Sequence, residues 1–157
     1  MGSAGIERDA LLNLLTEVHL LAPLSGGELR TLAGYLAWRD AEADEVIFSE
    51  GDPGDSLFLL AAGSVRIQKE SDERHACTIA VEDRSRAIGE MSLLDGEPRS
   101  ATCVALQPST LLVLTQEKLA ALAKSHPGLA YRVVTEIARL LSKRLRLTSG
   151  RLVESLS

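Results

Sequence analysis

The chain has 157 residues, 45% of them hydrophobic and 25% charged, with a formal net charge of −5. This composition is that of a folded globular chain, and it excludes disordered and fibrous classes. The negative balance gives no general attraction to DNA or to an acidic membrane. Its length suits one domain, residues 1–157.

No apolar run reaches the roughly 20 residues that a membrane-spanning helix needs. The only cysteines, Cys77 and Cys103, are too few for a disulfide-stapled secreted scaffold and lack the spacing of metal ligands. We therefore expect a cytoplasmic location and no membrane contact by this chain.

Residues 7–33 are expected to form N-terminal helices. Leucine and valine recur at the helical period over residues 7–21, and Pro23 ends that pattern. Ser25, followed three residues later by Glu28, is typical of a capping box. A second short helix should therefore extend from this box to Ala33.

Residues 35–114 change to short apolar runs separated by turn residues, which favours strands. The expected strands are Val46 to Ser49, Ser56 to Ala61, Ser64 to Lys69, Cys77 to Val81, Ala101 to Leu106 and Thr110 to Leu114. Since no long crossover helices separate them, the pattern predicts an antiparallel sandwich or barrel.

Residues 116–150 are expected to be helical again. One helix should cover Gln116 to Lys124, and a second should follow the break at His126 and Pro127 and run to about Leu147. Apolar positions of the last helix fall near coiled-coil spacing; they are Val133 or Val134, Ile137, Leu141, Leu145, Thr148 and Leu152. This stripe is expected either to pair with a second copy as a homodimer or to pack on the chain's own strands.

The segment from Gly89 to Thr102 holds the strongest candidate binding site. Gly89 precedes a predicted helical turn, where backbone can approach a ligand and the first amides lack intrahelical partners. Arg99 could grip a phosphate oxygen through charge-assisted hydrogen bonds, and Ser100 adds a hydroxyl donor. Glu90 would repel an anion unless it faces a donor such as a ribose 2′-hydroxyl.

This segment resembles the phosphate-binding cassette of the cyclic-nucleotide-binding domains, which occur in catabolite regulators, protein kinase regulatory subunits and cyclic-nucleotide-gated channels. The motifs Val46-Ile47-Phe48, Glu50 to Phe58 and Gly63 to Ile67 are also similar to that family's early strands, so the resemblance covers roughly residues 10–147. It implies an eight-stranded antiparallel β-roll, jelly-roll-like, with N-terminal helices and a C-terminal helical lid. The cassette would be residues 88–102.

The resemblance also assigns ligand-binding residues. They are Gly89, Glu90, Met91, Ser92, Arg99, Ser100 and Ala101. Gly89 and Glu90 would meet the ribose and phosphate, Arg99 and Ser100 the phosphate, and Ala101 would support the turn. Two segments depart from the family pattern: residues 83–88 replace a usual Gly-Asp pair and aromatic, and residues 40–45 replace a glycine-containing turn.

The implied function is that of a sensor for a cyclic mononucleotide, cAMP or cGMP with cAMP favoured, which needs no cofactor and is not an enzyme. Its C-terminal helix would pass the signal to an attached effector domain or partner subunit; Leu129, Arg132 and Val133 are candidate lid residues. The alternative is a structural or oligomerisation module that keeps the fold with a vestigial or repurposed pocket. Because the chain stops at Ser157 without a following helix-turn-helix, we expect no DNA binding by this chain.

A metal site is not expected. Glu50, Asp52 and Asp55 lie in a glycine-rich turn, where acidic residues are common for backbone reasons. The three histidines lie far apart in the sequence without ligand spacing.

Overall fold

The computed structural model describes residues 10–13, 15, 18–70, 76–83 and 86–156. Of the first predicted helix, residues 10–13 and 15 are helical, and residues 7–9, 14 and 16–17 lie outside the described residues. The other helical elements are η1 (His19–Leu21), α2 (Gly26–Ala33), α3 (Glu90–Asp95), α4 (Gln116–Ser125) and α5 (Pro127–Leu156). Both predicted C-terminal helices are therefore present.

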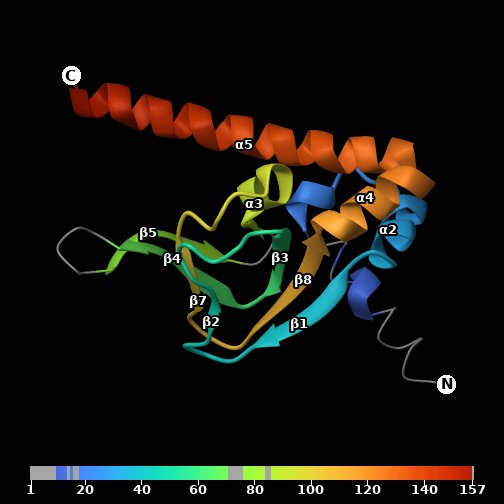
Figure 1. Ribbon diagram of the computed structural model, residues 1–157, viewed down its shortest axis with the longest axis horizontal. Coiled ribbons are helices and arrows are strands. Elements are labelled where there is room, and N and C mark those ends of the chain that lie inside the picture. The colour runs from blue at the N-terminus through green and yellow to red at the C-terminus, as the bar shows by residue number, and fades with distance from the viewer. Residues whose placement is uncertain (1–9, 14, 16–17, 71–75, 84–85, 157) are drawn as a thin grey trace.

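Two four-stranded antiparallel sheets form the β-roll, with strand orders β1-β8-β3-β6 and β2-β7-β4-β5 (Figure 1). The strands are β1 (Ala37–Ala41), β2 (Val46–Phe48), β3 (Ser56–Ala62), β4 (Ser64–Glu70), β5 (Ala76–Asp83), β6 (Arg86–Ile88), β7 (Thr102–Ala105) and β8 (Ser109–Thr115). The predicted fold class, mainly antiparallel β with flanking helices, is confirmed.

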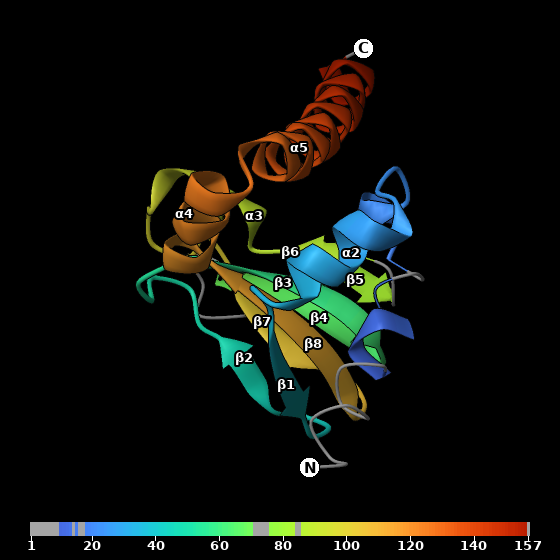
Figure 2. The same ribbon diagram turned by 90° about the vertical axis from the view of Figure 1, so that its right-hand side faces the viewer.

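Strand β3 lies between two hydrophobic cores, and its alternating side chains serve both. Leu57, Leu59 and Ala61 pack with the helices, whereas Phe58 and Leu60 pack inside the roll. Burial on both faces explains why this strand is a continuous apolar run. Figure 2 shows α2, α4 and α5 on the helical side of this arrangement.

Four elements differ from the sequence predictions. Where one helix was expected to run to residue 21, Val18 is not helical and η1 is a separate 3₁₀ helix. Strand β1 was not predicted because only Ala41 of it is buried, so pairing with β8 rather than an apolar pattern makes it a strand. Strand β6 was missed because it has only three residues. Helix α5 continues to Leu156, past the predicted end near Leu147, and carries Gly150 in its interior.

The capping box predicted for α2 is present. The backbone amide of Glu28 donates to the Ser25 hydroxyl, and the Glu28 carboxylate accepts from the backbone amide of Ser25.

Among the described residues, no helix is long and apolar enough to cross a membrane.

Candidate functional site

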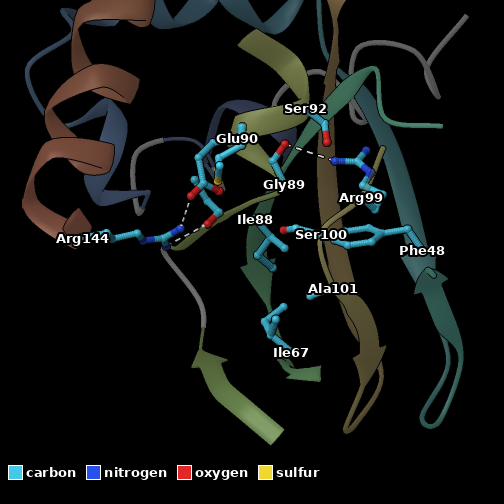
Figure 3. Close-up of a pocket in the computed structure, with 12 residues that line it drawn as sticks. Phe48, Ile67, Ile88, Gly89, Glu90, Ser92, Arg99, Ser100, Ala101 and Arg144 are labelled. Carbon is cyan, nitrogen blue, oxygen red and sulfur yellow. Dashed lines mark hydrogen bonds and ion pairs between the residues drawn. The ribbon is translucent and has the colours of Figure 1, made fainter. Parts of the chain in front are cut away.

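A pocket of about 140 Å³ lies between the β-roll, α3 and α5 (Figure 3). Its lining residues are Phe48, Ile67, Ala87, Ile88, Gly89, Glu90, Met91, Ser92, Arg99, Ser100, Ala101 and Arg144. Every residue of the predicted ligand-binding set is therefore brought to one cavity, although those residues are spread over α3 and the segment before β7.

Arg99 provides a buried cation in the wall of this pocket. Only 5% of the residue is exposed. Its Nη1 donates to the Gly89 carbonyl at 3.1 Å and its Nη2 to the Ser56 hydroxyl at 2.9 Å. The buried Nε atom has no hydrogen-bond partner among the described residues. An unpaired buried donor is costly, and Arg99 lines the pocket, so a bound anion that accepted from this atom would remove that cost.

Two opposing effects act on the pKa of Arg99. Burial lowers the pKa of Arg99, while the nearby carboxylates of Asp55, Asp52 and Glu90 raise it. Arginine begins so far above neutrality that the guanidinium stays protonated despite its burial. The pocket wall therefore carries a permanent positive charge.

Gly89 is required for the close approach of this arginine. Its φ of +75° is in the left-handed region, and a Cβ built there would lie 2.3 Å from Arg99 Nη1. Gly54 has a similar role against α3, because its Cβ would lie 2.3 Å from the Ser92 hydroxyl oxygen. The two glycines allow the cassette to fold tightly onto Arg99 and onto the turn before β3.

Ser92 is used within the cassette itself. Its side chain is buried and its hydroxyl donates to the Glu97 carbonyl at 3.0 Å. The amide of Gln116, at the start of α4, donates to the Ser92 carbonyl at 3.3 Å and to the Leu93 carbonyl at 3.0 Å. These contacts stabilise the helical turn that forms one wall of the pocket.

Glu90 lies on the other side of the pocket and is held by a residue that sequence reasoning did not assign. The carboxylate is buried, and Nη1 of Arg144 on α5 donates to it. Nη2 of Arg144 also donates to the Ala87 carbonyl at 3.0 Å. Figure 3 shows Arg144 approaching Glu90 from the side opposite Arg99. Helix α5 is thus fastened to the cassette.

The candidate lid residues lie elsewhere. Leu129 and Val133 are buried in the core shared with the other helices, and Arg132 pairs with Glu28 of α2. The only sequence signal for Arg144 was its basic charge on the last helix, which several other residues share.

The remaining predicted residues complete the pocket edge. Ala101 is buried, whereas Ser100 and Met91 are exposed at the rim. The Ser100 carbonyl accepts a hydrogen bond from Lys69 at 3.2 Å. Ser100 therefore presents its hydroxyl at an accessible edge rather than in the interior.

The acidic turn before β3 supports the cassette. The Asp52 carbonyl accepts from the Arg99 amide at 2.9 Å, and the Asp52 carboxylate accepts from the Ser49 amide at 3.0 Å. Among the described residues, no group of three potential metal ligands comes together. Both the carbonyl and the carboxylate of Asp52 are thus used in contacts that hold the turn.

The pocket therefore combines a cation, a carboxylate and apolar walls from Phe48, Ile67 and Ile88. It suits a ligand with an anionic group, a hydroxyl donor and a flat apolar part. Cys103, in the roll interior, is no nucleophile for such a ligand, because burial raises the pKa of its thiol to about 12.

Comparison with known proteins gives the class to which this fold and pocket belong. Residues 38–126 match the cyclic nucleotide-binding domain. The chain is 36% identical to the cyclic AMP receptor protein of Thermus thermophilus over 128 residues, which cover 82% of this chain and 56% of that protein. The chain belongs to the cyclic nucleotide-binding domain family.

Two further relatives extend the comparison. A crystal structure of a cyclic nucleotide-binding domain from Methylobacillus flagellatus superposes with a TM-score of 0.83 at 34% identity, covering 97% of this chain and 85% of the other. Glutaminase 1 of Bradyrhizobium diazoefficiens is 32% identical over 131 residues, or 83% of this chain and 21% of that protein. The chain thus spans about half or less of these two curated relatives.

Proposed function

We propose that the chain binds a cyclic mononucleotide as a regulatory signal and performs no chemistry on it. The observation that carries this proposal is the buried Arg99, whose Nε lacks a partner among the described residues in the wall of the pocket. A cyclic phosphate would supply the missing acceptor through a charge-assisted hydrogen bond. The Glu90 carboxylate, on the opposite side, would accept from the ribose 2′-hydroxyl.

Between the two bases, we propose cAMP as the ligand and cGMP as its competitor. The name of the Thermus thermophilus relative, a cyclic AMP receptor protein, supports adenine. The apolar side chains of Ile67 and Ile88 would contact either base, so they do not by themselves select between them.

Isothermal titration calorimetry of the purified chain tests the proposal, with cAMP, cGMP, 2′-deoxy-cAMP and linear AMP as ligands. We expect saturable one-to-one binding that is tighter for cAMP than for cGMP and weak for AMP. The deoxy analogue should bind less tightly than cAMP because it leaves the buried Glu90 without its new donor. Folded, nucleotide-free protein that gives no heat with either cyclic nucleotide would refute the sensor function.

We further propose that α5 carries the signal. Arg144 joins α5 directly to Glu90, the carboxylate that the ribose would use. A ligand that engages Glu90 must change its contact with Arg144 or share it, so occupancy of the pocket and the position of α5 are coupled. The ligand can shift α5 only to the extent that it binds one position better than the other. We propose that an attached domain or a partner subunit reads the position of α5.

Assembly through α5 is a second candidate function. The helix carries a row of residues spaced alternately by three and four positions, which we call the α5 stripe: Tyr131, Val134, Ala138, Leu141, Leu145 and Thr148. All are exposed except Leu141, which is half-buried against the chain's own core. Val133 and Ile137, by contrast, are buried against the chain's own core. The stripe is thus the face on which a second copy would pack.

A further inference from the structure

The guanidinium of Arg99 lies against an aromatic pair. Its central carbon is 4.4 Å from the centroid of the Phe48 ring and 5.5 Å from that of Phe58. The two rings stack on each other at 5.7 Å with an angle of 28° between their planes. Aromatic faces carry partial negative charge, so they attract the cation without offering it a hydrogen-bond acceptor.

An irregularity in β2 places Phe48 at this position. Val46 pairs with Val104 and Phe48 with Cys103, so β2 advances two residues while β7 advances one. Such bulges change the direction of a side chain and are common beside functional sites. Phe48 consequently lines the pocket, while Ile47 is buried inside the roll.

The hydrogen bonds and the ring restrain Arg99 in different directions. Nη1 bonds to Gly89 and Nη2 to Ser56, and both contacts act near the plane of the guanidinium. They leave the group able to tilt about the line that joins its two terminal nitrogens. Such a tilt displaces Nε, the atom without a partner among the described residues. A ring packed over the guanidinium opposes that tilt.

We propose that Phe48 is a positioning residue for Arg99 and that its ring keeps Nε presented to the phosphate of the ligand. This inference rests on the proposed nucleotide binding. An aliphatic side chain would occupy part of the same space without attracting the cation. The aromatic character of residue 48, and not only its volume, is therefore what the site requires.

Calorimetry with cAMP on four proteins measures the effect. Phe48→Leu should weaken binding by about tenfold, equivalent to about 1.4 kcal/mol and within the range of desolvated cation–π contacts. Phe48→Tyr, which keeps an aromatic face, should stay within about twofold of the wild type. Val46→Ala is the matched control, because Val46 lies on the same strand, is exposed and does not line the pocket.

A double-mutant cycle separates positioning from simple wall packing. In an Arg99→Gln background there is no cation for the ring to hold. Adding Phe48→Leu should therefore lower the affinity for cAMP by less than about twofold more. An equal loss in both backgrounds would mean that Phe48 acts on the ligand by itself, and it would overturn the proposal.

A second readout needs no nucleotide. In a proton–nitrogen NMR spectrum of the arginine Nε–H groups, the Arg99 signal is identified by its loss in Arg99→Gln. A proton over a ring face is shielded, so this signal should move downfield in Phe48→Leu and stay in place in Phe48→Tyr. If the wild type bound no cyclic nucleotide, the proposed function would fail, yet this spectrum would still test the stacking. An Arg99 signal that does not move in Phe48→Leu would contradict the proposed role of Phe48.

Discussion

Arg99 combines two tasks that depend on the shape of its side chain. Its terminal nitrogens tie Gly89 to Ser56 and so connect the cassette to β3, while the buried Nε has no partner among the described residues. Lysine carries the same charge but cannot make these contacts together, because its ammonium is a single point at the end of a flexible stem. The site therefore depends on the planar guanidinium with its several N–H donors and not on positive charge alone.

Arg99→Lys should accordingly weaken cAMP binding by roughly 10- to 150-fold, which corresponds to about 1.5–3 kcal/mol for a hydrogen bond to a charged group. Calorimetry measures the loss, and a thermal melt shows whether the variant still folds. Arg139→Lys, on the exposed side of α5, should bind like the wild type. Unchanged affinity in Arg99→Lys would show that the phosphate is held elsewhere.

At the scale of elements, the stability that the capping box of α2 contributes to the fold depends on pH. The hydrogen bond from the backbone amide of Ser25 is the largest effect and lowers the pKa of Glu28 from its ordinary value of 4.5. Burial opposes it, and the charge of Arg132 on α5 lowers the pKa further. A carboxyl group with a lowered folded pKa stabilises the fold above its unfolded pKa. That contribution disappears as the pH falls through the folded pKa.

Glu28→Gln should therefore lower the melting temperature at neutral pH, and the difference from the wild type should shrink as the pH falls below 4.5. Melting curves across this range measure it. Glu42→Gln, an exposed carboxylate in a turn, serves as the control and should show little difference at any pH. If the melting temperature of Glu28→Gln stayed below that of the wild type at the lowest pH, the effect would come from helix packing rather than from the charge of Glu28.

Elements that bury their own side chains could be predicted from the sequence, and elements defined by distant partners could not. Strand β3 is apolar because both of its faces are buried, whereas β1 is exposed along most of its length. Helix α5 continues through Gly150 because one glycine weakens a helix by only about 1 kcal/mol, too little to stop it.

The candidate site divides in the same way. The cassette residues are neighbours in the sequence, so their spacing shows the site directly. Arg144 lies 54 residues from Glu90, and their contact exists only because α5 returns over α3. No local pattern distinguishes Arg144 from the other basic residues of the last helix. Phe48 likewise reaches Arg99 only through the pairing of β2 with β7.

The link between Arg144 and Glu90 predicts how α5 responds to the ligand. Hydrogen exchange of α5 should change when cAMP binds the wild type, and this change should be largely lost in Arg144→Ala. Arg139→Ala is the matched control, since Arg139 pairs with Glu136 within the same helix. A full nucleotide-dependent change in Arg144→Ala would mean that α5 is coupled to the pocket by another route.

At the scale of the whole molecule, only part of α5 is covered by the rest of the chain. The first half packs through Leu129, Val133 and Ile137, and Arg144 joins the helix to Glu90, while the C-terminal end stands away from the sheets (Figure 2). Leu145 is 66% exposed and Leu147 is 55% exposed. Only Leu145 belongs to the α5 stripe, whose alternating spacing is that of a coiled-coil seam.

Packing of two stripes against each other would bury Leu145 of both copies. Leu145→Glu should therefore weaken a homodimer by about 100-fold or more, since each of two lost leucines contributes roughly 1.5 kcal/mol. Leu147→Glu introduces the same charge into an exposed leucine off the stripe and should leave the dimer intact. Size-exclusion chromatography with light scattering, over a range of protein concentrations, distinguishes them. A wild type that stays monomeric throughout, or two variants that dissociate equally, would mean that the α5 stripe does not join copies of this chain.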